Sequence, residues 1–431
     1  MKSSLPKVMH RIAGRTLIGH VLDHLAPLHL ARVVAVIAPG MDEVAEEVAP
    51  HGVAFQTEQL GTGHAVGSAR QALKDFTGDI LVVYGDTPFV ATATLQRMFD
   101  RRHAADNPAI VVLGMRPADP SGYGRLVLGA DGGLERIVEH KDASEAERAI
   151  GLANSGVMVI DGAAVWSLID RLDNKNAKGE YYLTDLVAHA RKDRHRCAVV
   201  EAPVEELLGV NSRSELAAAE AMFQAKRRLA AMESGATLTD PASVFFAADT
   251  RIGRDVVIGP NVQFGLGVEI ADDVEIRAFC HIEGARIESG AIVGPFARLR
   301  PGSTIGAGAR VGNFVELKAT ELGAGAKASH LTYLGDATIG AKSNIGAGTI
   351  TCNYDGFTKA RTTIGAGAFI GSDTSLVAPV TVGDGAIVAA GSVITHDVPA
   401  DALAVAREQQ VDKPGWAAKF RAKQKSKSKK D

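Results

Sequence analysis

A carboxylate at the end of an apolar run is the first group in this 431-residue chain that could do chemistry. The segment Ile80–Pro88 has the composition of a buried strand that ends in an exposed Asp86. A hard oxygen ligand at a strand end suits Mg²⁺, because a substrate's phosphates can supply the other ligands. From this stretch alone, a turn-capping role for Asp86 is the simpler interpretation.

A second candidate lies upstream, where the segment Gln56–Ala65 places Gly61 and Gly63 directly before a helix-like run. Free backbone N–H groups at the start of a helix can face an anionic ligand. Glycines before helices are common, so this pattern by itself indicates little.

A third candidate is a break in a repeat between Thr351 and Ile364. The inserted residues Cys352–Phe357 are too polar to continue a buried face, and a loop on a rigid scaffold is where ligands are commonly bound. His330 precedes this break, and a histidine near its ordinary pKa of ~6.5 suits a general base. An isolated histidine is usually structural, but one beside a broken repeat is a better candidate.

The repeat itself has a period of six residues and runs from about Arg251 to His396. Apolar residues return at Ile252, Ile258, Phe264, Ile270, Ile276 and Ile282, then at Val293, Leu299, Ile305, Val311 and Leu317, then at Leu322, Ala328, Leu334, Ile339 and Ile345, and last at Ile364, Ile370, Leu376, Val382, Val388 and Ile394. This period fits neither a helix nor an alternating strand, and it predicts a parallel β-helix whose rungs stack their aliphatic side chains into one core.

The residues before the repeat alternate short apolar runs with helix-like segments, which predicts an α/β domain with a mostly parallel sheet. The expected strands are Val33–Ala38, Ile80–Tyr84, Ile110–Leu113, Val157–Ile160 and Ala198–Val200. Ligands of such sheets lie beyond the carboxyl ends of the strands. The segment Leu216–Met232, rich in Ala, Arg and Glu, predicts a connecting helix. We therefore expect domains at residues 1–211 and 237–408, a linker helix at 212–236, and a C-terminal segment at 409–431.

Composition excludes several classes of protein. A net charge of −3 provides no basic field for nucleic acid, although Lys419–Lys430 form a Lys-rich tail that we expect to be disordered. No apolar run approaches the ~20 residues that span a bilayer. Three scattered cysteines, Cys197, Cys280 and Cys352, indicate a reducing compartment and no disulfide framework.

Two sets of segments resemble, in order, the bifunctional bacterial N-acetylglucosamine-1-phosphate uridylyltransferase/glucosamine-1-phosphate N-acetyltransferase family. The set before the repeat comprises Ser4–Val8, Glu58–Ala65, Tyr84–Asp86, Gly122–Arg125, Val138–Asp142, Asn154–Gly156, Gly179–Asp185 and Gly209–Asn211. The set in the repeat comprises Pro295–Gly302, Gly312–Lys318, His330–Asp336, Asn344–Gly348 and Cys352–Gly356. The resemblance implies an α/β fold class: a Rossmann-like nucleotidyltransferase domain joined by a linker helix to an acetyltransferase domain that is a left-handed parallel β-helix of hexapeptide repeats.

By this resemblance, the first domain uses Mg²⁺ and transfers uridylyl from UTP to N-acetylglucosamine 1-phosphate. Lys7 would neutralise phosphate, and Asp86 and Asn211 would hold the metal. Residues implied to contact the uracil, the sugar or the rest of the nucleotide sugar are Gln56, Gly61, Thr62, Tyr84, Gly85, Gly124, Glu139 and Asn154. Two anions meet in this reaction, so cations and hydrogen-bond donors must stabilise the charge.

The second domain would transfer acetyl from acetyl-CoA to glucosamine 1-phosphate. The resemblance makes His330 the general base, has Arg300 and Lys318 bind the sugar phosphate, and has Ala347, Ser372, Ala390 and Arg407 meet acetyl-CoA. The acceptor site would be lined by Tyr333, Asn344, Asn353 and Tyr354. The family further implies a cytoplasmic homotrimer that serves peptidoglycan and lipopolysaccharide precursor synthesis, with neither a membrane span nor a nucleic-acid partner.

Other functions are open on the sequence. A sugar-1-phosphate nucleotidylyltransferase with a structural or regulatory β-helix would need no His330, Arg300, Lys318 or Asn353–Tyr354 loop. A zinc hydratase would need three convergent histidines, but His281, His330 and His396 lie at spacings that do not suggest one site. A non-catalytic scaffold does not explain polar constellations in both domains.

The chain departs from the family's pattern at its start. Members carry a buried strand and a Gly-rich loop directly before the segment that corresponds to Ser4–Lys7, whereas here Met1 takes the last position of that loop. We expect a start assigned too late. A chain that begins here should have little uridylyltransferase activity, because loop N–H groups cradle a triphosphate and the loss of one donor commonly costs ~10²- to 10³-fold in rate. It should retain acetyl transfer.

Overall fold

The computed structural model describes residues 1–176 and 178–427. The chain divides into two compact units, Met1–Phe223 and Gln224–Asp431. We call the first the α/β unit and the second the β-helix unit, and describe each by itself.

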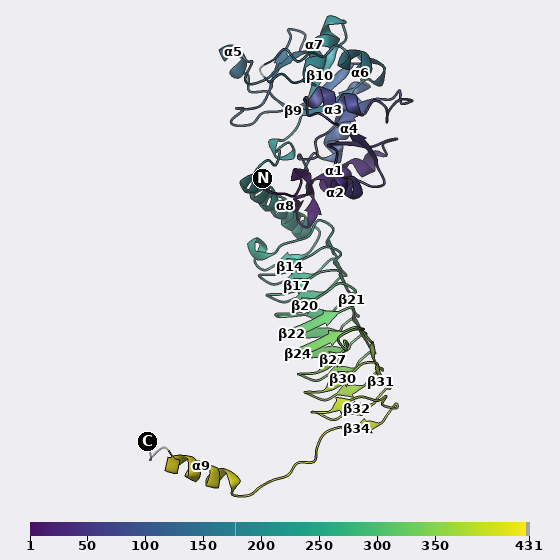
Figure 1. Ribbon diagram of the computed structural model, residues 1–431, viewed down its shortest axis with the longest axis vertical. Coiled ribbons are helices and arrows are strands. Elements are labelled where there is room, and N and C mark those ends of the chain that lie inside the picture. The colour runs from purple at the N-terminus through teal and green to yellow at the C-terminus, as the bar shows by residue number, and fades with distance from the viewer. Residues whose placement is uncertain (177, 428–431) are drawn as a thin grey trace. The chain divides into compact units, whose positions relative to one another are not determined.

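The α/β unit contains ten short strands and seven α-helices among its described residues, with the first residues of α8 at its end (Figure 1). The strands are β1 (Arg11–Ile12), β2 (Arg15–Thr16), β3 (Val34–Ile37), β4 (Gly52–Phe55), β5 (Ile80–Val82), β6 (Ile110–Met115), β7 (Arg125–Leu128), β8 (Leu134–Val138), β9 (Ala153–Ile160) and β10 (Cys197–Glu201). The helices are α1 (Leu17–Leu25), α2 (Asp42–Glu47), α3 (Thr62–Ser68), α4 (Thr92–Arg102), α5 (Glu145–Arg148), α6 (Gly162–Ile169) and α7 (Asp185–Lys192).

The main sheet of this unit has the strand order β10-β6-β9-β7-β8, with β5 also paired to β9. The five strands expected from the sequence are confirmed as β3, β5, β6, β9 and β10, but the expectation of a mostly parallel sheet is wrong. Among the described strands of this sheet, only β10 and β6 pair in parallel, because β9 runs antiparallel to β5, β6 and β7, and β7 runs antiparallel to β8. Apolar runs predict strands that are buried on both faces, but they carry no information on strand direction.

Both faces of the main sheet are buried. Along β6 and β9, alternate residues enter two different apolar clusters. One holds Val112 and Met158, and the other holds Val111 and Val159. This alternation is the period of two that a strand imposes on its side chains. The sheet is therefore a rigid layer from which its loops project.

A second, two-stranded parallel sheet consists of β3 and β4. Within residues 1–176 and 178–427, no ladder joins β3 to β5. An apolar cavity of about 370 Å³ is lined by Val34–Ile37 of β3 and Ile80–Gly85 at β5, together with Val8 and Ile18. Apolar residues of β3 and β5 thus line the same cavity, although no backbone ladder joins the two described strands.

Strands β11 to β34 of the β-helix unit are short and stack as parallel rungs, drawn in teal, green and yellow in Figure 1. The first half comprises β11 (Thr237–Leu238), β12 (Arg251–Ile252), β13 (Val257–Ile258), β14 (Gln263–Phe264), β15 (Glu269–Ile270), β16 (Glu275–Ile276), β17 (His281–Ile282), β18 (Ala285–Ile287), β19 (Ile292–Val293), β20 (Arg298–Leu299), β21 (Ser303–Ile305) and β22 (Arg310–Lys318). The second half comprises β23 (Glu321–Leu322), β24 (Lys327–Gly335), β25 (Ala337–Ile339), β26 (Asn344–Ile345), β27 (Ile350–Cys352), β28 (Thr362–Ile364), β29 (Phe369–Ile370), β30 (Ser375–Val377), β31 (Val380–Val382), β32 (Ile387–Val388), β33 (Val393–Ile394) and β34 (Leu403–Ala404).

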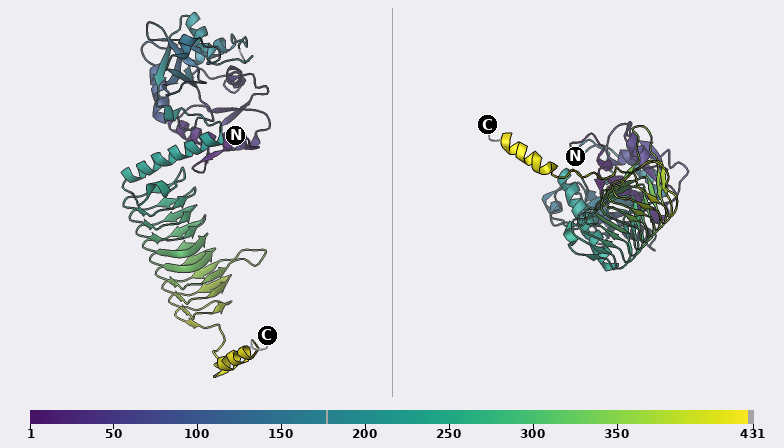
Figure 2. Two further views of the ribbon diagram at one scale, coloured as in Figure 1. Left: turned by 90° about the vertical axis from the view of Figure 1, so that its left-hand side faces the viewer. Right: turned by 90° about the horizontal axis from the view of Figure 1, so that it is seen from below.

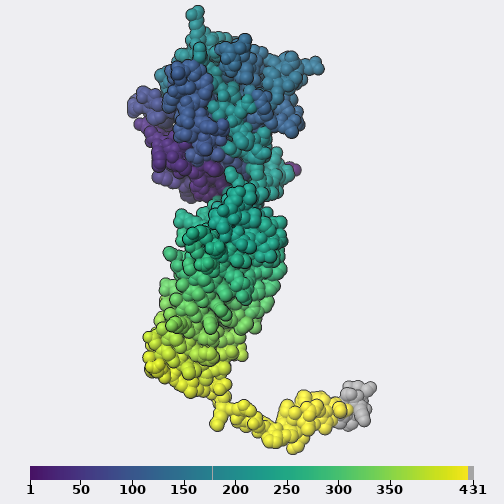
Figure 3. Space-filling view, turned by 180° about the vertical axis from the view of Figure 1, so that it is seen from behind, coloured from purple at the N-terminus to yellow at the C-terminus, as the bar shows by residue number. Residues whose placement is uncertain are grey.

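The register of the stack confirms the six-residue repeat. Ile252 pairs with Ile270, and Ile258 pairs with Ile276, so one rung takes three repeats. The repeated aliphatic residues form one continuous core cluster. The stacked coils are visible in Figure 2, and the space-filling view in Figure 3 shows the surface of this stack, coloured from teal to yellow. Every ladder between these strands is parallel. Because each rung is built from three repeats of six residues, a period of six rather than two dominates this part of the sequence.

The predicted break in the repeat is confirmed as a loop between β27 and β28. Ile339 pairs with Ile364 across the insertion, and the core pairing continues with Val382 on the next rung. An isolated antiparallel bridge joins Tyr354 to Lys359 in the loop, which stands away from the stacked coils in the left view of Figure 2. The stack thus accommodates the insertion without losing its register.

The predicted connecting helix is confirmed as α8 (Arg213–Glu233). Its second half covers the first coil of the β-helix, where the buried Gln224 donates to Phe246 O at 2.7 Å and accepts from Phe246 N at 2.8 Å. Arg228 Nε donates to Val244 O at 2.8 Å. These contacts satisfy backbone groups that the end of a stack would otherwise leave unpaired.

The expectation of a disordered Lys-rich tail is wrong for the part that the structure describes. Residues Trp416–Lys427 form helix α9, whose described side chains are exposed. Lys, Ala, Arg and Gln are good helix formers, so low apolar content did not prevent a local helix. The rest of the expected tail, residues 428–431, lies outside the described residues. None of the described helices is both long and apolar enough to cross a membrane.

Candidate active sites

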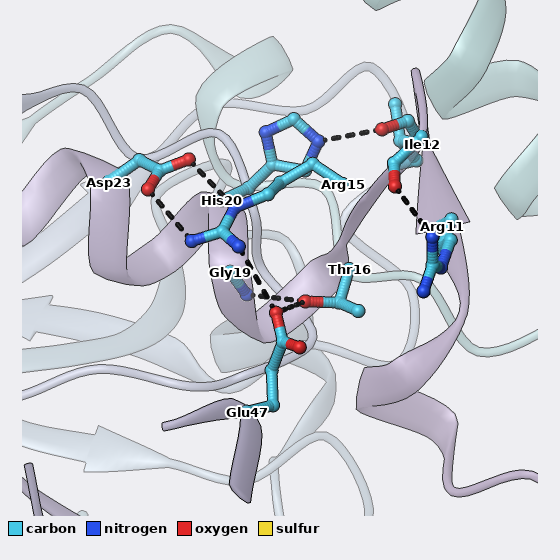
Figure 4. Close-up of polar contacts among 9 residues, drawn as sticks. Arg11, Ile12, Arg15, Thr16, Gly19, His20, Asp23 and Glu47 are labelled. Atoms are coloured by element: carbon cyan, nitrogen blue, oxygen red, sulfur yellow. Dashed lines mark hydrogen bonds and ion pairs between the residues drawn. The ribbon is translucent and has the colours of Figure 1, made fainter. Parts of the chain in front are cut away.

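Polar contacts around α1 hold the first residues of the α/β unit in place (Figure 4). Thr16 caps α1 by accepting from Gly19 N at 2.9 Å, and it donates to Glu47 of α2 at 2.7 Å. Arg15 pairs with Asp23 and with the same Glu47. The β1–β2 hairpin and α1 are therefore tied to α2, and they follow directly on the 3₁₀ turn η1 (Lys7–Met9).

Lys7, Asp86 and Asn211 meet in one place although they lie far apart in the sequence. Lys7 Nζ is hydrogen-bonded to Asp86 Oδ2 and lies 3.0 Å from Asn211 Oδ1. A Cβ atom added at Gly85 would lie 3.0 Å from side-chain atoms of both Val8 and Ile18, so glycine permits the close approach of the β5 end to η1. The structure thus brings together the three residues that the resemblance assigned to phosphate and metal.

The oxygen atoms of this group fit a hard divalent cation. Asp86 Oδ2 and Asn211 Oδ1 are carboxylate and amide oxygens, the ligand types that Mg²⁺ prefers, and the Lys7 ammonium lies between them as a cation would. Within the described ranges, no group of three or more His, Cys, Asp or Glu side chains could hold a metal. A metal at Asp86 and Asn211 would therefore need ligands from a substrate or from water.

A second group of predicted residues surrounds Tyr84. Burial, followed by the charges of Asp86 and Glu139, raises the pKa of Tyr84 to about 12. Burial also raises the pKa of Glu139, which accepts a hydrogen bond from Thr184 Oγ1 at 3.3 Å. Asn154 is buried and donates from its backbone to Gly124 O at 2.8 Å. These are polar groups of the kind that orient the hydroxyl groups of a ligand.

The loop before α3 forms a third group. Gln56 Nε2 donates to Gly61 O at 3.1 Å and lies 3.1 Å from His64 Nδ1. Thr62 Oγ1 accepts from Leu183 N at 3.1 Å, so the loop is held by the segment after residue 180. The predicted residues Gln56, Gly61 and Thr62 are brought together, and the geometry adds His64, which the sequence analysis quoted but gave no role.

The β-helix unit contains a cluster of charges on three successive rungs. Lys318 Nζ lies 3.2 Å from Asp336 Oδ2, and the same oxygen accepts from Asn353 Nδ2 at 2.5 Å. On the rung before, Arg300 pairs with Glu316 at 3.0 Å. Burial would raise the pKa of Asp336, but the hydrogen bonds from Asn353 and Lys318 outweigh it and lower that pKa. Asp336 is therefore a fixed anion that positions a lysine and an amide.

Lys359, from the inserted loop, joins this cluster and was missed by the sequence analysis. Its pKa is lowered mainly by the neighbouring Lys318 ammonium and further by Arg300, because like charges disfavour another protonated amine beside them. Lysines repel unless an anion lies between them, so Arg300, Lys318 and Lys359 form a site for an anion such as phosphate. A cation inside a polar insertion was the available signal. We call these three residues the cationic cluster.

Tyr333 and Asn353 extend the cationic cluster over Gly335. A Cβ atom added at Gly335 would lie 2.4 Å from Tyr333 Oη and 2.7 Å from Asn353 Nδ2, so only glycine leaves room for both side chains. Tyr354 is exposed and donates to Gly356 O at 2.5 Å. The predicted Tyr333 and Asn353 thus adjoin the cluster, whereas Tyr354 points into its own loop.

His330 lies on a different edge of the prism. Its Nδ1 is 2.7 Å from Asn313 Oδ1 on the preceding rung, and the imidazole is exposed. Asn313, with no role assigned from the sequence, is placed to hold the ring and select its tautomer. The described part of the chain places no hydrogen-bond partner on Nε2, so a side chain fixed in this way can accept a proton there.

The residues that the resemblance assigned to acetyl-CoA continue along the edge that carries His330. Gly348 N donates to Leu331 O at 3.0 Å, Asp373 N to Ala347 O at 2.7 Å, and Gly391 N to Ser372 O at 2.8 Å. Arg407 lies beside Gly391, with its Cδ 3.9 Å from a Cβ atom added there. These contacts form a column along four successive steps of the chain, made of His330, Ala347, Ser372, Ala390 and Arg407. An extended ligand could lie along this column.

Within one chain, the His330 edge and the cationic cluster bound the same side of the prism. The second half of β24 separates His330 from Asp336, and a strand advances about 3.3 Å per residue. Asn344 lies on a neighbouring side, paired in register with Lys327 and Phe369. Among the described residues, His330 is bonded to Asn313 whereas Lys318 and Arg300 are bonded to Asp336 and Glu316, so the predicted acetyltransferase residues fall into two groups.

Comparison with known proteins agrees with this division. Residues 1–155 match the model of the MobA-like NTP transferase domain, and residues 249–284, 284–319 and 361–396 match that of the bacterial transferase hexapeptide, six repeats.

Full-length relatives are also found. The chain is 60% identical to the bifunctional protein GlmU of Paramagnetospirillum magneticum over 432 residues, covering 100% of this chain and 96% of the relative. It is 60% identical to that of Rhodospirillum rubrum over 98% of this chain and 94% of the relative, and 51% identical to that of Zymomonas mobilis over 99% and 96%. With both family models in order and identity spread over nearly the whole length, the chain belongs to the family of bifunctional GlmU proteins.

Proposed function

We propose that each unit carries one of the two transferase activities of this family in UDP-N-acetylglucosamine synthesis. The β-helix unit transfers acetyl from acetyl-CoA to glucosamine 1-phosphate. The α/β unit then transfers uridylyl from UTP to N-acetylglucosamine 1-phosphate and releases pyrophosphate. The observation that carries the proposal is the pair of anion-binding groups, one in each unit: Lys7 beside Asp86 and Asn211, and the cationic cluster.

In acetyl transfer, the cationic cluster binds the phosphate of glucosamine 1-phosphate, and Tyr333, Asn344, Asn353 and Tyr354 line the acceptor site. The ammonium of glucosamine must lose a proton before its nitrogen can attack the thioester, and His330 accepts that proton. Asn313 holds His330 Nδ1 at 2.7 Å, which leaves Nε2 as the acceptor. The column of Ala347, Ser372, Ala390 and Arg407 binds acetyl-CoA.

We further propose that the acetyltransferase site forms between copies of the chain in a trimer. His330 and the cationic cluster lie on two edges of the same prism, so a neighbouring prism can complete the site. Phe279, Phe296, Phe314 and Leu331 stand exposed at successive corners beside Asn313 and His330, all with positive φ. Bulky residues rarely adopt this backbone conformation, and exposed apolar corners of this kind are expected where another surface covers them.

Light scattering combined with acetylation assays tests the trimer. The chain should scatter as a trimer, and acetyl transfer should fall with the trimer fraction on dilution. Mixing a His330→Ala variant with a Lys318→Met variant should restore activity if one site takes residues from two copies. A fully active monomer would exclude the shared site.

In uridylyl transfer, Mg²⁺ held by Asp86 and Asn211 would neutralise phosphate charge. Lys7 binds phosphate at the same place, which lowers the repulsion between the sugar phosphate and UTP. Gln56, Gly61 and Thr62 hold the uracil. Tyr84, Gly85, Gly124, Glu139 and Asn154 hold the sugar, and the high pKa of Tyr84 keeps its hydroxyl a donor at neutral pH.

Product analysis separates this function from its main alternative. The protein is given glucosamine 1-phosphate, acetyl-CoA and UTP separately and together, and the products are identified by mass. We expect N-acetylglucosamine 1-phosphate without UTP. With all three substrates we expect UDP-N-acetylglucosamine as well, at the low rate that the sequence analysis predicts. Uridylyl transfer without any acetyl transfer would instead indicate a nucleotidylyltransferase with a structural β-helix. We place the enzyme in the cytoplasm, where it would serve peptidoglycan and lipopolysaccharide precursor synthesis.

A further inference from the structure

The Lys7 ammonium lies where the metal of the proposed uridylyltransferase site would bind. Its Nζ bonds Asp86 Oδ2 and lies 3.0 Å from Asn211 Oδ1, and these are the two oxygens that would ligate a divalent cation. One ammonium thus bridges two oxygens from positions more than a hundred residues apart. A cation from solvent must compete with it for the same electron pairs.

An ammonium and a divalent ion cannot share this oxygen pair. Both carry positive charge, and at ligand distances their repulsion is strong unless an anion separates them. Lys7 must therefore leave Asp86 before the metal can take up that oxygen. The phosphate of an incoming nucleotide is the anion that can receive the displaced ammonium.

The structure allows Lys7 to move by side-chain rotation alone. Its backbone is held in η1 by Met9 N donating to Pro6 O at 3.0 Å, and Val8 packs against Gly85. The Lys7 side chain is 39% exposed, compared with 22% for Asp86. Its four-carbon stem can turn from the carboxylate toward a phosphate without any change in the backbone.

We propose that Lys7 competes with the metal for its site. Its ammonium occupies the oxygen pair of Asp86 and Asn211 until a metal–nucleotide complex arrives, and it then moves from the Asp86 carboxylate to a phosphate of the nucleotide. Free metal therefore binds weakly, whereas metal and nucleotide phosphate bind in a coupled way. This inference rests on the proposed uridylyltransferase site and deepens it. It gives Lys7 two roles: it controls when the metal can bind, and it binds phosphate.

Metal binding without nucleotide tests the inference independently of catalysis. Mn²⁺ is titrated into the full chain and into Lys7→Met, and free Mn²⁺ is measured by electron paramagnetic resonance. Removal of the competitor should lower the dissociation constant on the order of fivefold, the effect of losing one partly exposed ion pair. Lys192→Met, a lysine of α7 far along the chain, is the matched control and should bind as the parent does.

Further variants separate the inference from the proposed function. Lys7→Gln keeps a polar group and should also bind Mn²⁺ more tightly than the parent, and circular dichroism confirms that both variants are folded. In the Lys7→Met background, Asp86→Asn should abolish the gain. Site-specific binding that is equal in parent and Lys7→Met would overturn only the competition by Lys7. Failure of Lys7→Met to bind Mn²⁺, or a gain that survives Asp86→Asn, would overturn the metal site as well.

Discussion

The two units of this chain build their sites in opposite ways. In the β-helix unit, Arg300, Lys318 and Asp336 recur one rung apart, so neighbours in space follow a fixed step in the sequence. In the α/β unit, Lys7, Asp86 and Asn211 meet from unrelated positions. A repeat therefore brings together residues that lie one fixed step apart in the sequence, whereas an α/β sheet brings together residues at no fixed spacing.

The two units also differ in how completely their backbones are paired. Rungs of the β-helix follow one another without a gap, even across the inserted loop. In the α/β unit, β3 and β5 face each other across an apolar cavity of about 370 Å³. A stack can accommodate an insertion because each rung contacts only its neighbours, whereas an interrupted sheet loses contacts on both sides of the gap.

The largest effect that would test this comparison is the loss of the general base. His330→Ala should lower acetyl transfer about 10²- to 10⁴-fold, because that is the typical contribution of a positioned general base. Uridylyl transfer should not change, since the residue lies in the other unit. Initial rates of both reactions, measured on protein of unchanged circular dichroism, check this prediction.

The matched control for His330 is His396→Ala, an exposed histidine later in the same repeat. It should leave both rates within about twofold, as expected for a surface substitution away from a site. Acetylation by His330→Ala within a few-fold of the parent would remove His330 from the mechanism.

The corresponding experiment in the α/β unit changes Asp86. Asp86→Asn removes the charged oxygen that holds Lys7 and the proposed metal, so uridylyl transfer should fall about 10²-fold or more. Acetyl transfer should stay at the parent rate. Asp75→Asn, an exposed carboxylate before β5, is the control. If Asp86→Asn lowered both activities equally, the two sites could not be independent.

A smaller effect is expected at the residue that the inserted loop contributes. Lys359→Gln should raise the KM for glucosamine 1-phosphate severalfold to about tenfold with a smaller change in kcat, because it removes one of three cations from a ground-state phosphate contact. Lys342→Gln, an exposed lysine at a corner of the same stack, should change neither constant. A loss confined to kcat would argue against phosphate binding by Lys359.

The smallest effect concerns packing rather than chemistry. Leu317→Ala in the continuous core should destabilise the β-helix unit by about 2–5 kcal/mol. Leu81→Ala beside the cavity should cost the α/β unit less, below about 2 kcal/mol, because Leu81 lacks packing partners on one side. Denaturant unfolding, followed separately for each unit, measures both values. Equal losses would show that the cavity is filled in solution.

Much of the fold could be predicted from the sequence, and the successes share a physical cause. The period of six predicted the stacked rungs, and the polar break predicted the loop that carries Asn353 and Tyr354. The connecting helix α8 was also predicted. Each of these signals is local or periodic, so it survives without knowledge of tertiary contacts.

The features that the sequence analysis predicted wrongly, or did not predict, have a different cause. The direction of β9 follows from its position between β5 and β6, which an apolar run does not encode. Helix α9 arose from local propensity where composition suggested disorder. Asn313 carries no signal of its own, because a polar residue gains a role only from the neighbours that folding gives it. Lys359 carried a weak signal, its charge inside a polar insertion, but only folding places it beside Lys318.

The sequence by itself determined the two architectures and the chemical types of the groups in both sites, because side-chain periodicity and residue chemistry are properties of the chain. Only the tertiary structure decided which groups meet: that Lys7 takes the oxygen pair of Asp86 and Asn211, and that His330 lies on a different edge of the prism from Lys318. The physical reason is the separation in sequence of the residues that interact. Periodic patterns reflect interactions between near neighbours, whereas a charge or hydrogen bond acts over a few ångströms and depends on the final path of the backbone.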